Sequence, residues 1–391
     1  MKEVIVAGVG MTGFGKFLNR NLKSLSEEAV ASALADAGIV AAQVDQVIFA
    51  NAAAGVVTGQ EMIRGEASLR NTGLSGKPMF NVENACASSS TGFHLAWLMV
   101  ASGQAECVLV VGSEKLTHED KAVSFAAFAR AVDLEEPLPE GYRAGSGSLF
   151  MDLYAAKARK WMAGTGATAE DFARVVVKSR HAASLNPDAQ FRQETTAEEV
   201  LQSRMISDPL TLFMCSSIGD GAAAIVLTSE DFAKKLGAPM VRVRASAVVS
   251  AHAEGGSEPV AVTASRKAYE IASIGPEDLH VIELHDASAP AELIHYENLG
   301  ICPSGGGAIE LIRSGATAIG GRLPVNPSGG LLSRGHPIGA TGAAQIVELT
   351  RQLRGTAGAR QREGAKVALA ENNGGQLAGD SAIAAVTILV A

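Results

Sequence analysis

The chain has 391 residues, a formal net charge of −8 and 47% hydrophobic residues, a composition that supports large cores and excludes a disordered chain. The acidic balance argues against a nucleic-acid-binding protein, which normally carries a basic stripe. Apolar runs such as Ser381–Ala391 are too short to span a bilayer, and Val4–Val9 is typical of an opening strand rather than of a signal peptide.

Short β-branched runs alternate with Ala-rich helical patterns, which predicts an α/β architecture. The expected strands are Glu3–Val9, Gln46–Ala50, Phe80–Val82, Cys107–Gly112, Ala223–Leu227, Val241–Ala245, Val281–Leu284, Lys366–Ala370 and Ile383–Val390. Most are apolar throughout, which suits strands that are covered on both faces. The expected helices are Leu25–Ala37, Ser88–Ser102, Ala169–Leu185, Ser265–Ile274 and Gly342–Leu353, the first with a capping box at Ser24–Glu27.

The segment Gly8–Gly13 matches the dinucleotide-binding pattern G-x-G-x-x-G after the first expected strand. In that motif the glycines open directly into a helix whose N-terminus holds the pyrophosphate. Here the first clear helix begins only near Ser24, and no acidic residue ends the second strand, which leads into Asn51. The pattern therefore favours a glycine-rich turn at the strand exit over a cofactor site.

The segment Asn84–Gly92 places Cys86 close to the start of the expected helix Ser88–Ser102. The positive end of a helix dipole favours the thiolate, which is the reactive form of cysteine. Cys86 is therefore a candidate nucleophile, with a buried structural cysteine as the alternative. The other cysteines are interpreted as structural: Cys107, Cys215 and Cys302. Their scattered spacing predicts neither a zinc site nor disulfides, and free thiols favour a reducing, cytoplasmic compartment.

Two histidines occupy settings that suit a partner for Cys86. His336 lies in the glycine-dense stretch Asn326–Gly342 before an expected helix, and a thiolate paired with an imidazole is an activated nucleophile. His285 follows the buried-type strand Val281–Leu284, and its alternative is a core histidine satisfied by a backbone carbonyl. The remaining histidines are assigned surface or packing roles: His94, His118, His181, His252, His280 and His295.

An internal repeat links these motifs. The turn, helix and strand that follow Cys86 recur in the same order after His336, and similar strands precede Asn51 and His285. The repeat predicts two similar halves related by a pseudo-twofold, with Cys86 facing His336; a chance match of Ala-rich segments is the alternative. Lys115–Met214 has no counterpart in the second half, and we expect it to be an insertion that covers the site.

Together these segments resemble the thiolase superfamily, most closely the sterol-carrier-protein thiolases and their bacterial and archaeal relatives. The resemblance covers nearly the whole chain and rests on Gly8–Lys16, Asn84–Gly92, Ala169–Phe191, Asp220–Ala224, Glu283–Ser288, Asn326–Gly342 and the turn after Ala370. It implies a five-layered αβαβα fold. The N-terminal half would comprise residues 1–114 and 215–250, the inserted loop region residues 115–214, and the C-terminal half residues 251–391.

The resemblance also implies roles for the site residues. Cys86 matches the cysteine that carries the acyl group, and His336 matches the histidine that activates it and helps to bind the thioester oxygen. His285 matches the position that completes the oxyanion site. The backbone near the thioester is expected to come from Gly335, Gly374 and Gly375. Coenzyme A and acyl-CoA are expected as substrates, with no metal and no tightly bound cofactor.

The chain departs from the family pattern at the second reactive cysteine, which acts as acid and base on the substrate carbon. Many members carry it in a Cys-x-Gly turn, where this chain has Ala370–Gly375, and the sterol-carrier branch carries it in His-Asp-Cys-Phe, where this chain has His285–Ser288. Neither stretch contains cysteine. Glu371 and His285 are the nearest replacements; alternatively, Glu371 caps a turn and water or His285 delivers the proton.

The expected function is that of a thiolase-type acyl-CoA C-acyltransferase, which cleaves a 3-oxoacyl-CoA with CoA or catalyses the reverse Claisen condensation. A bulky or aromatic substrate such as 2-benzoylsuccinyl-CoA is one specialised version. The alternatives are acyl transfer to a non-CoA carbon nucleophile and a non-catalytic, CoA-ester-binding subunit of a complex. The resemblance predicts a homodimer or tetramer, a small zinc-ribbon/OB-fold accessory subunit, and no sterol-carrier domain after Ala391.

Overall fold

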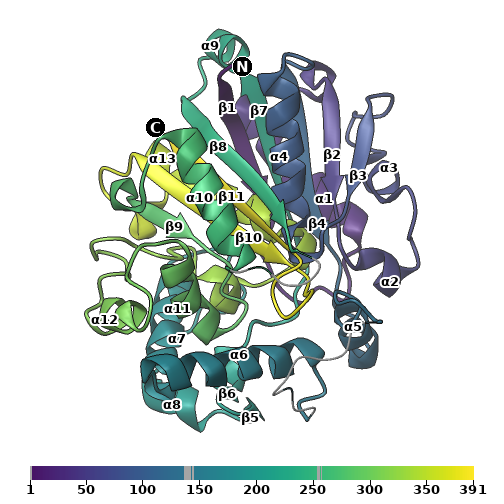
Figure 1. Ribbon diagram of the computed structural model, residues 1–391. Helices are drawn as coiled ribbons and strands as arrows, with labels where there is room; N and C mark the ends of the chain where they lie inside the picture. Colours follow the sequence, from purple (N-terminus) through teal and green to yellow (C-terminus); the bar gives the residue numbers. More distant parts are fainter. Residues whose placement is uncertain (1, 136–141, 143–144, 253–255, 257) are drawn as a thin grey trace.

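The computed structural model describes residues 2–135, 142, 145–252, 256 and 258–391 (Figure 1). The strands are β1 Val4–Met11, β2 Gln46–Ala50, β3 Met79–Val82, β4 Cys107–Glu114, β5 Met205–Ser207, β6 Leu210–Thr211, β7 Gly221–Ser229, β8 Val241–Ser250, β9 Val281–Glu283, β10 Val367–Gly374 and β11 Ile383–Val390. The helices are α1 Leu22–Ala37, α2 Ala54–Thr58, α3 Arg64–Leu69, α4 Ser88–Ala101, α5 Lys121–Phe128, α6 Leu149–Thr165, α7 Ala169–Ser184, α8 Ala197–Gln202, α9 Glu230–Leu236, α10 Val260–Ala272, α11 Ala289–Asn298, α12 Gly307–Arg313 and α13 Thr341–Arg354. None of the described helices is both long and apolar enough to cross a membrane.

The strands divide into two similar halves, but the expected boundary between the halves is wrong at β8. This strand lies within residues 215–250, expected in the N-terminal half, and it belongs to the second half because it pairs along its length with β11. The strands follow the order β3-β2-β4-β7-β1-β8-β11-β10-β9, in which β1 to β4 and β7 form one half and β8 to β11 form the other. In the first half β2 is parallel to β3 and β4, while β7 is antiparallel to β4 and β1. In the second half β9 is parallel to β10 and to a bridge at Val325, while β11 is antiparallel to β10 and β8. Each half therefore repeats one topology, and the halves join where β1 pairs with β8.

Helices separate and cover the two halves of the sheet, giving five layers. Helix α1 packs on β1 and β7, and α10 packs on β8 and β11. Helices α4 and α13 lie between the halves: α4 contacts β2 and β4 as well as β8 and β11, and α13 contacts β7 and β10. Three apolar cores fill the spaces between these layers. The predicted αβαβα architecture is thus confirmed.

The two central helices touch at their N-terminal ends. A Cβ atom on Gly342 of α13 would lie 1.9 Å from Ser90 Oγ of α4, so only glycine allows this approach. The amide of Ala343 also donates to Ser89 Oγ at 3.0 Å. The turns that precede the two helices, which carry Cys86 and His336, are brought together by this contact.

The segment without a counterpart in the second half, residues 115–214, contains α5 to α8 and the small β5–β6 hairpin. These elements lie together at one end of the layered body, in the lower part of Figure 1. Helix α7 packs against α11 of the second half and against η5, Gly330–Arg334, which precedes His336. The segment therefore lies at the end of the sheets where the repeat places the two turns.

Several expected boundaries are wrong for identifiable reasons. Strand β1 runs through Gly8 and Gly10 to Met11, so these glycines do not form a turn. A Cβ on Gly8 would lie 2.5 Å from Ala37 Cβ, and one on Gly10 would lie 2.4 Å from the Ala33 amide nitrogen, so both glycines serve close packing against α1.

The first helix begins at Leu22, earlier than expected, and it is capped by Asn21 rather than by a box at Ser24–Glu27. The Asn21 side chain accepts a hydrogen bond from the Ser24 amide at 2.9 Å. Strand β10 likewise continues to Gly374, so most of the expected turn after Ala370 is strand. The polar residues at the end of β10 do not suggest a strand from their sequence. They are held in one by backbone hydrogen bonds to β11.

Candidate active site

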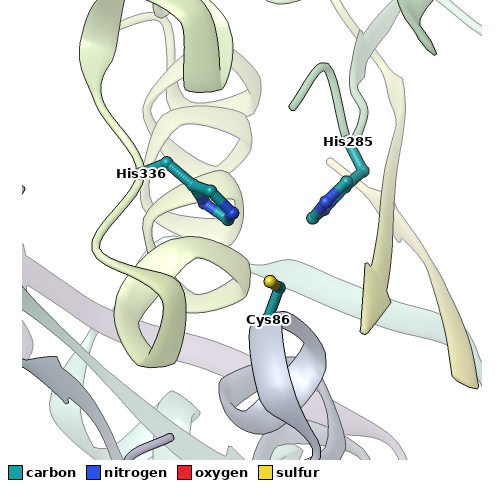
Figure 2. Close-up of side chains that lie close together, drawn as sticks. All are labelled: Cys86, His285 and His336. Carbon is teal, nitrogen blue, oxygen red and sulfur yellow. The ribbon is translucent and has the colours of Figure 1, made fainter. Parts of the chain in front are cut away.

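Cys86, His285 and His336 meet at the junction of the two halves (Figure 2). Cys86 belongs to the short turn η2, Ala85–Ala87, before α4, while His336 precedes η6, Ile338–Ala340, before α13. Their sulfur and nitrogen atoms, together with those of His285, lie within 4.8 Å of one another, and all three residues are buried. The two imidazole rings stand edge to face with centroids 5.3 Å apart. This spacing brings a thiol and two imidazoles within reach of proton transfer.

The local backbone turns Cys86 towards the histidines. Ala85 adopts φ +48°, a left-handed conformation that is unfavourable for a residue with a side chain. The amide of Asn84 donates to Ser88 Oγ at 2.9 Å, and Ser88 Oγ donates to the Ala85 carbonyl. These bonds hold the strained turn at the start of α4.

The thiol of Cys86 is un-ionised at neutral pH, contrary to the expectation from its helix-start position. Burial raises the pKa of Cys86 to about 12, and the charge of Glu114 raises it further. The backbone N–H groups of Cys86 and Gly375 face the sulfur and oppose this shift. Because desolvation outweighs the dipole, the thiolate requires a base in contact with the sulfur.

Hydrogen bonds orient the imidazole of His336. The Thr341 hydroxyl donates to the Pro337 carbonyl at 3.0 Å and so accepts from His336 Nδ1–H at 2.8 Å. The other ring nitrogen, Nε2, therefore keeps its lone pair. Burial lowers the pKa of His336 well below its ordinary value, and the charges of His285 and Arg334 add to this effect.

The imidazole of His285 is oriented in the same way by Asn372. The Asn372 amide donates to the Cys86 carbonyl at 2.9 Å, which directs its oxygen to His285 Nδ1 at 2.6 Å. His285 Nε2 therefore also keeps its lone pair while the ring is neutral. It can donate to a thioester oxygen, as the oxyanion role requires, only after it has gained a proton. Burial lowers the pKa of His285 to about 4, although Glu371 favours its protonated form.

Glu371 lies behind the site and lines neither cavity beside Cys86. Because β10 continues past it, Glu371 is a fully buried strand residue whose Oε2 accepts from the His285 amide at 2.9 Å. The expectation that it faces the site from a strand exit is wrong for this reason. Burial raises the pKa of Glu371 to about 7.

Two cavities meet at Cys86. One, of about 500 Å³, includes His336 in its wall, and the other, of about 530 Å³, includes His285. We call them the His336-side cavity and the His285-side cavity. Both are lined by Cys86, Ala287, and Phe150 and Tyr154 of α6. Ala287 belongs to the stretch His285–Ser288, in which the resemblance led us to expect a second cysteine, and a larger side chain at Ala287 would lie where the two cavities meet.

The three glycines expected near the thioester separate into two groups. Gly374 and Gly375 line the His285-side cavity. Gly335 lines neither cavity; a Cβ on it would lie 2.9 Å from Gln190 Oε1 and 3.3 Å from Phe14 Cβ. Its role is close packing behind His336, which leaves only the other two glycines beside the site.

Four residues of the site were not predicted from the sequence. His295, expected to have a surface or packing role, lines the His285-side cavity together with Asn373. Asn372 sets the tautomer of His285, as described above. Glu114, at the end of β4, accepts from the Ala52 amide at 3.1 Å and from the Gly339 amide at 3.0 Å, so it ties the two halves together. The sequence offers one signal for Glu114: a charged residue at the end of an apolar, buried strand often has a functional role.

Among the described residues, Cys86, His285 and His336 form the group of His, Cys, Asp or Glu side chains that is close enough to hold a metal ion. Sulfur and nitrogen donors suit zinc. A metal-bound thiolate would, however, be held away from substrate, whereas the two lone-pair nitrogens are placed to accept its proton. We therefore assign the three residues to thiol chemistry.

Comparison with known proteins extends over almost the entire chain. Residues 4–231 match the family model of the thiolase N-terminal domain, and residues 245–388 match a thiolase C-terminal domain-like model. The chain is 39% identical to sterol carrier protein 2 of Bos taurus over 386 residues, which are 95% of this chain and 70% of that protein. It is 38% identical to acetyl-CoA acetyltransferase of Methanothermobacter thermautotrophicus over 381 residues, 96% of this chain and 97% of that one.

Two further comparisons bear on the chemistry. Benzoylsuccinyl-CoA thiolase subunit BbsB of Thauera aromatica is 38% identical over 361 residues, which are 90% of this chain and 89% of that protein. The solved structure of an Ltp2-ChsH2(DUF35) aldolase superimposes with a TM-score of 0.79 at 28% identity, covering 100% of this chain and 98% of that chain. Proteins of this architecture thus include enzymes with different named activities.

Proposed function

The chain belongs to the thiolase family, and from this premise we propose that it is an acyl-CoA C-acyltransferase that makes or breaks a carbon–carbon bond through a thioester on Cys86. The observation that carries the proposal is a buried thiol whose sulfur lies within 4.8 Å of nitrogen atoms of two imidazoles. Neutral imidazoles with free lone pairs are suited to take the thiol proton as the sulfur attacks.

In the degradative direction, an imidazole takes the proton of Cys86 and the sulfur attacks C3 of a 3-oxoacyl-CoA. The C2–C3 bond then breaks, and its electron pair leaves on the enolate of the shortened CoA ester, which takes up a proton. The thiol of CoA next attacks the acyl group on Cys86, releasing acyl-CoA and restoring the thiol. The N–H groups of Cys86 and Gly375 face the sulfur, a position suited to stabilise the oxygen of an acyl-sulfur adduct.

The acylation test uses acetyl-CoA and benzoyl-CoA as separate donors. We expect the mass of the corresponding acyl group on a peptide that contains Cys86. Labelling that maps only to Cys107, Cys215 or Cys302 would reject the assignment.

We propose further that the substrate carries a bulky or aromatic acyl group, as the name of the Thauera relative suggests for that protein. Aromatic residues make up only 5% of the chain, yet four of them line the His336-side cavity: Phe125, Phe128, Phe150 and Tyr154. Phe150 contacts both Phe128 and Tyr154, with ring centroids 6.5 Å and 5.9 Å away. Such a wall suits an aryl group, because offset and edge-to-face ring contacts add to the effect of burial.

Replacing Phe150 with alanine tests this substrate class. We expect kcat/KM for thiolysis of a benzoyl-substituted 3-oxoacyl-CoA to fall about 5-fold relative to that of acetoacetyl-CoA, since a lost ring contact is worth roughly 1 kcal/mol. Phe232→Ala is the control, because Phe232 is half-buried on α9 and lines neither cavity. Equal losses for the two substrates would contradict a dedicated aromatic subsite.

A second candidate is aldol cleavage of a 3-hydroxyacyl-CoA, which the similarity to a named aldolase and the absence of the second family cysteine favour. That reaction removes a proton from a hydroxyl group and forms no acyl-cysteine. Activity on a 3-hydroxyacyl-CoA that survives Cys86→Ala would support it. The third reading, a non-catalytic subunit, would leave Cys86 unacylated by every donor.

We propose that the chain acts as a homodimer or tetramer and that a small zinc-ribbon/OB-fold subunit joins it. Exposed apolar side chains lie on the edge strand β3 and just before α3, which packs against β3: Phe80 is 43% exposed, Met62 80% and Ile63 64%. A free apolar strand edge favours association. The DUF35 component named with the aldolase and the word subunit in the Thauera name support an accessory chain. Light scattering of the purified chain tests the first part, and a monomer that is stable and active would contradict it.

A further inference from the structure

His295 brings a third imidazole to the space beside Cys86. It projects from α11, is 8% exposed and lines the His285-side cavity. Its Nε2 lies 3.2 Å from the amide nitrogen of Asn373, which lines the same cavity. Its Nδ1 lies 3.3 Å from the side-chain amide nitrogen of Asn298 and 3.6 Å from Oε1 of Glu371. Each ring nitrogen therefore meets the side-chain amide of a cavity-lining asparagine, and Nδ1 also faces a buried carboxyl group.

Glu371 has one oxygen atom free to exchange a proton with His295. Its Oε2 accepts a hydrogen bond from the His285 amide, whereas its Oε1 is buried and has no partner in good hydrogen-bond geometry among the described residues; the nearby Asn373 side chain favours the charged form of the carboxyl group. Burial raises the pKa of this carboxyl group to about 7, so both of its protonation states are populated near neutrality. An unpartnered buried oxygen is costly unless it has a function or exchanges a proton.

We propose that His295 and Glu371 together perform the proton transfer at the substrate α-carbon for which relatives use a second cysteine. The inference rests on the proposed carbon–carbon chemistry, and it names the acid and base that this reaction needs at the substrate α-carbon. His295 is the catalytic residue, since it lines the cavity, and Glu371 is a positioning residue that acts through His295. Ala287, in the stretch where the resemblance led us to expect that cysteine, has no proton to give.

The step balances in both directions. In condensation, His295 Nε2 takes the α-proton of the CoA ester, and Nδ1–H passes its proton to the Glu371 carboxylate. The enolate attacks the acyl group on Cys86, the acyl C–S bond breaks, and the Cys86 sulfur leaves as the thiolate. In thiolysis, the C2–C3 bond breaks, the enolate carbon takes the proton from Nε2–H, and the Glu371 carboxyl group returns its proton to Nδ1. His295 changes tautomer and carries no lasting charge.

The charged groups around His295 suit such a relay. Burial lowers the pKa of His295 to about 4; Lys157 of α6 lowers it further and Asp380 opposes this. Lys157 is itself bonded to Gln376 Oε1 at 3.1 Å, and burial lowers its pKa. The other nearby imidazole, that of His285, already donates from Nδ1 to Asn372 Oδ1, so this nitrogen does not exchange a proton with His295. His295 is thus neutral near pH 7, and the proton it transfers is stored on Glu371.

The test separates acylation from proton transfer with one probe, acetyl-CoA in deuterium oxide. Transfer of the acetyl group to Cys86 reports the proposed function, and deuterium entering the methyl group of acetyl-CoA reports the relay. We expect His295→Gln to acylate at the wild-type rate and to lose exchange by about 10²-fold or more. Cys215→Ala is the matched control, since Cys215 lines the other cavity and offers the remaining nearby thiol.

Two further measurements distinguish a relay from a structural role. In the wild type, exchange should rise with pH through about 7, where Glu371 becomes a carboxylate able to accept the proton. Glu371→Gln should lose this inflection while acylation persists. In His295→Ala, added imidazole should restore exchange.

Each outcome decides the inference. Exchange at the wild-type rate in His295→Gln, loss of exchange in Cys215→Ala, or acylation without exchange in the wild type would overturn the relay and leave the proposed function standing. Failure of every His295 variant to acylate would also overturn it, because His295 would then serve the fold or the first half-reaction. A wild type that is never acylated would reject the proposed function itself.

Discussion

Cys86→Ala should abolish acyl transfer, with kcat/KM for thiolysis falling by at least about 10⁴-fold. Losses of this size follow removal of a nucleophile from a site whose groups act as a unit. The sulfur lies where the two cavities meet, so no other described thiol can carry the acyl group at the same place. The measurement is thiolysis of a 3-oxoacyl-CoA together with the mass of the trapped acyl-enzyme.

Cys215→Ala is the control for this substitution. Cys215 also lines the His336-side cavity, and burial raises its pKa to about 12. It does not belong to the cluster of one thiol and two imidazoles that Cys86 forms with His285 and His336. We expect this variant to keep its acyl-enzyme and most of its activity. Loss in Cys215→Ala with retention in Cys86→Ala would move the nucleophile to Cys215.

His336→Ala should slow alkylation of Cys86 by iodoacetamide at pH 7 by about 10²-fold, the usual scale for loss of a general base. Without this base the thiol follows its own pKa of about 12, which burial sets. The thiolate fraction in the variant should then rise about tenfold per pH unit up to that value, because each unit of pH below the pKa costs a factor of ten. Alkylation measured from pH 6 to 10 and mapped to Cys86 gives the profile.

His285→Ala is the comparison. We expect it to spare alkylation but to lower turnover by about 10²–10³-fold, the cost of losing an oxyanion donor, a role that His285 can fill only after its Nε2 has gained a proton. The opposite result, with slow alkylation only in His285→Ala, would transfer the base role to His285. The structure makes this a sharp alternative, since Glu371 favours a positive charge on His285 while Arg334 disfavours one on His336.

The sequence could predict the scaffold because local pattern and tertiary packing agree there. Strand β2 occupies the expected Gln46–Ala50, an apolar run with both ends well marked. The repeat correctly brings Cys86 and His336 to equivalent turns at the start of α4 and α13. Because the same turn, helix and strand recur in the same order after each residue, the sequence alone predicts that Cys86 and His336 lie at equivalent turns.

The proton-handling groups could not be predicted in the same way. Asn372 and Asn373 have low strand propensity, and they belong to β10 only because they pair with Ala385 and Ala384 of β11. This pairing turns Glu371 into the core and leaves its Oε1 facing His295. His295 lies in an ordinary helical pattern, and only the packing of α11 reveals its buried neighbours. Tautomers set by Thr341 and Asn372 likewise depend on contacts between distant segments.

The equivalence of the Cys86 and His336 turns has a consequence for how such a site can arise. Two identical halves joined by an exact twofold axis would present the same side chain twice at this point, either two thiols or two imidazoles. A nucleophile and its base are different groups, so perfect symmetry cannot hold both. Covalent linkage of the halves in one chain allows each copy to mutate independently. Divergence at a single matched position is therefore a precondition of the chemistry, and the rest of the scaffold is free to stay alike.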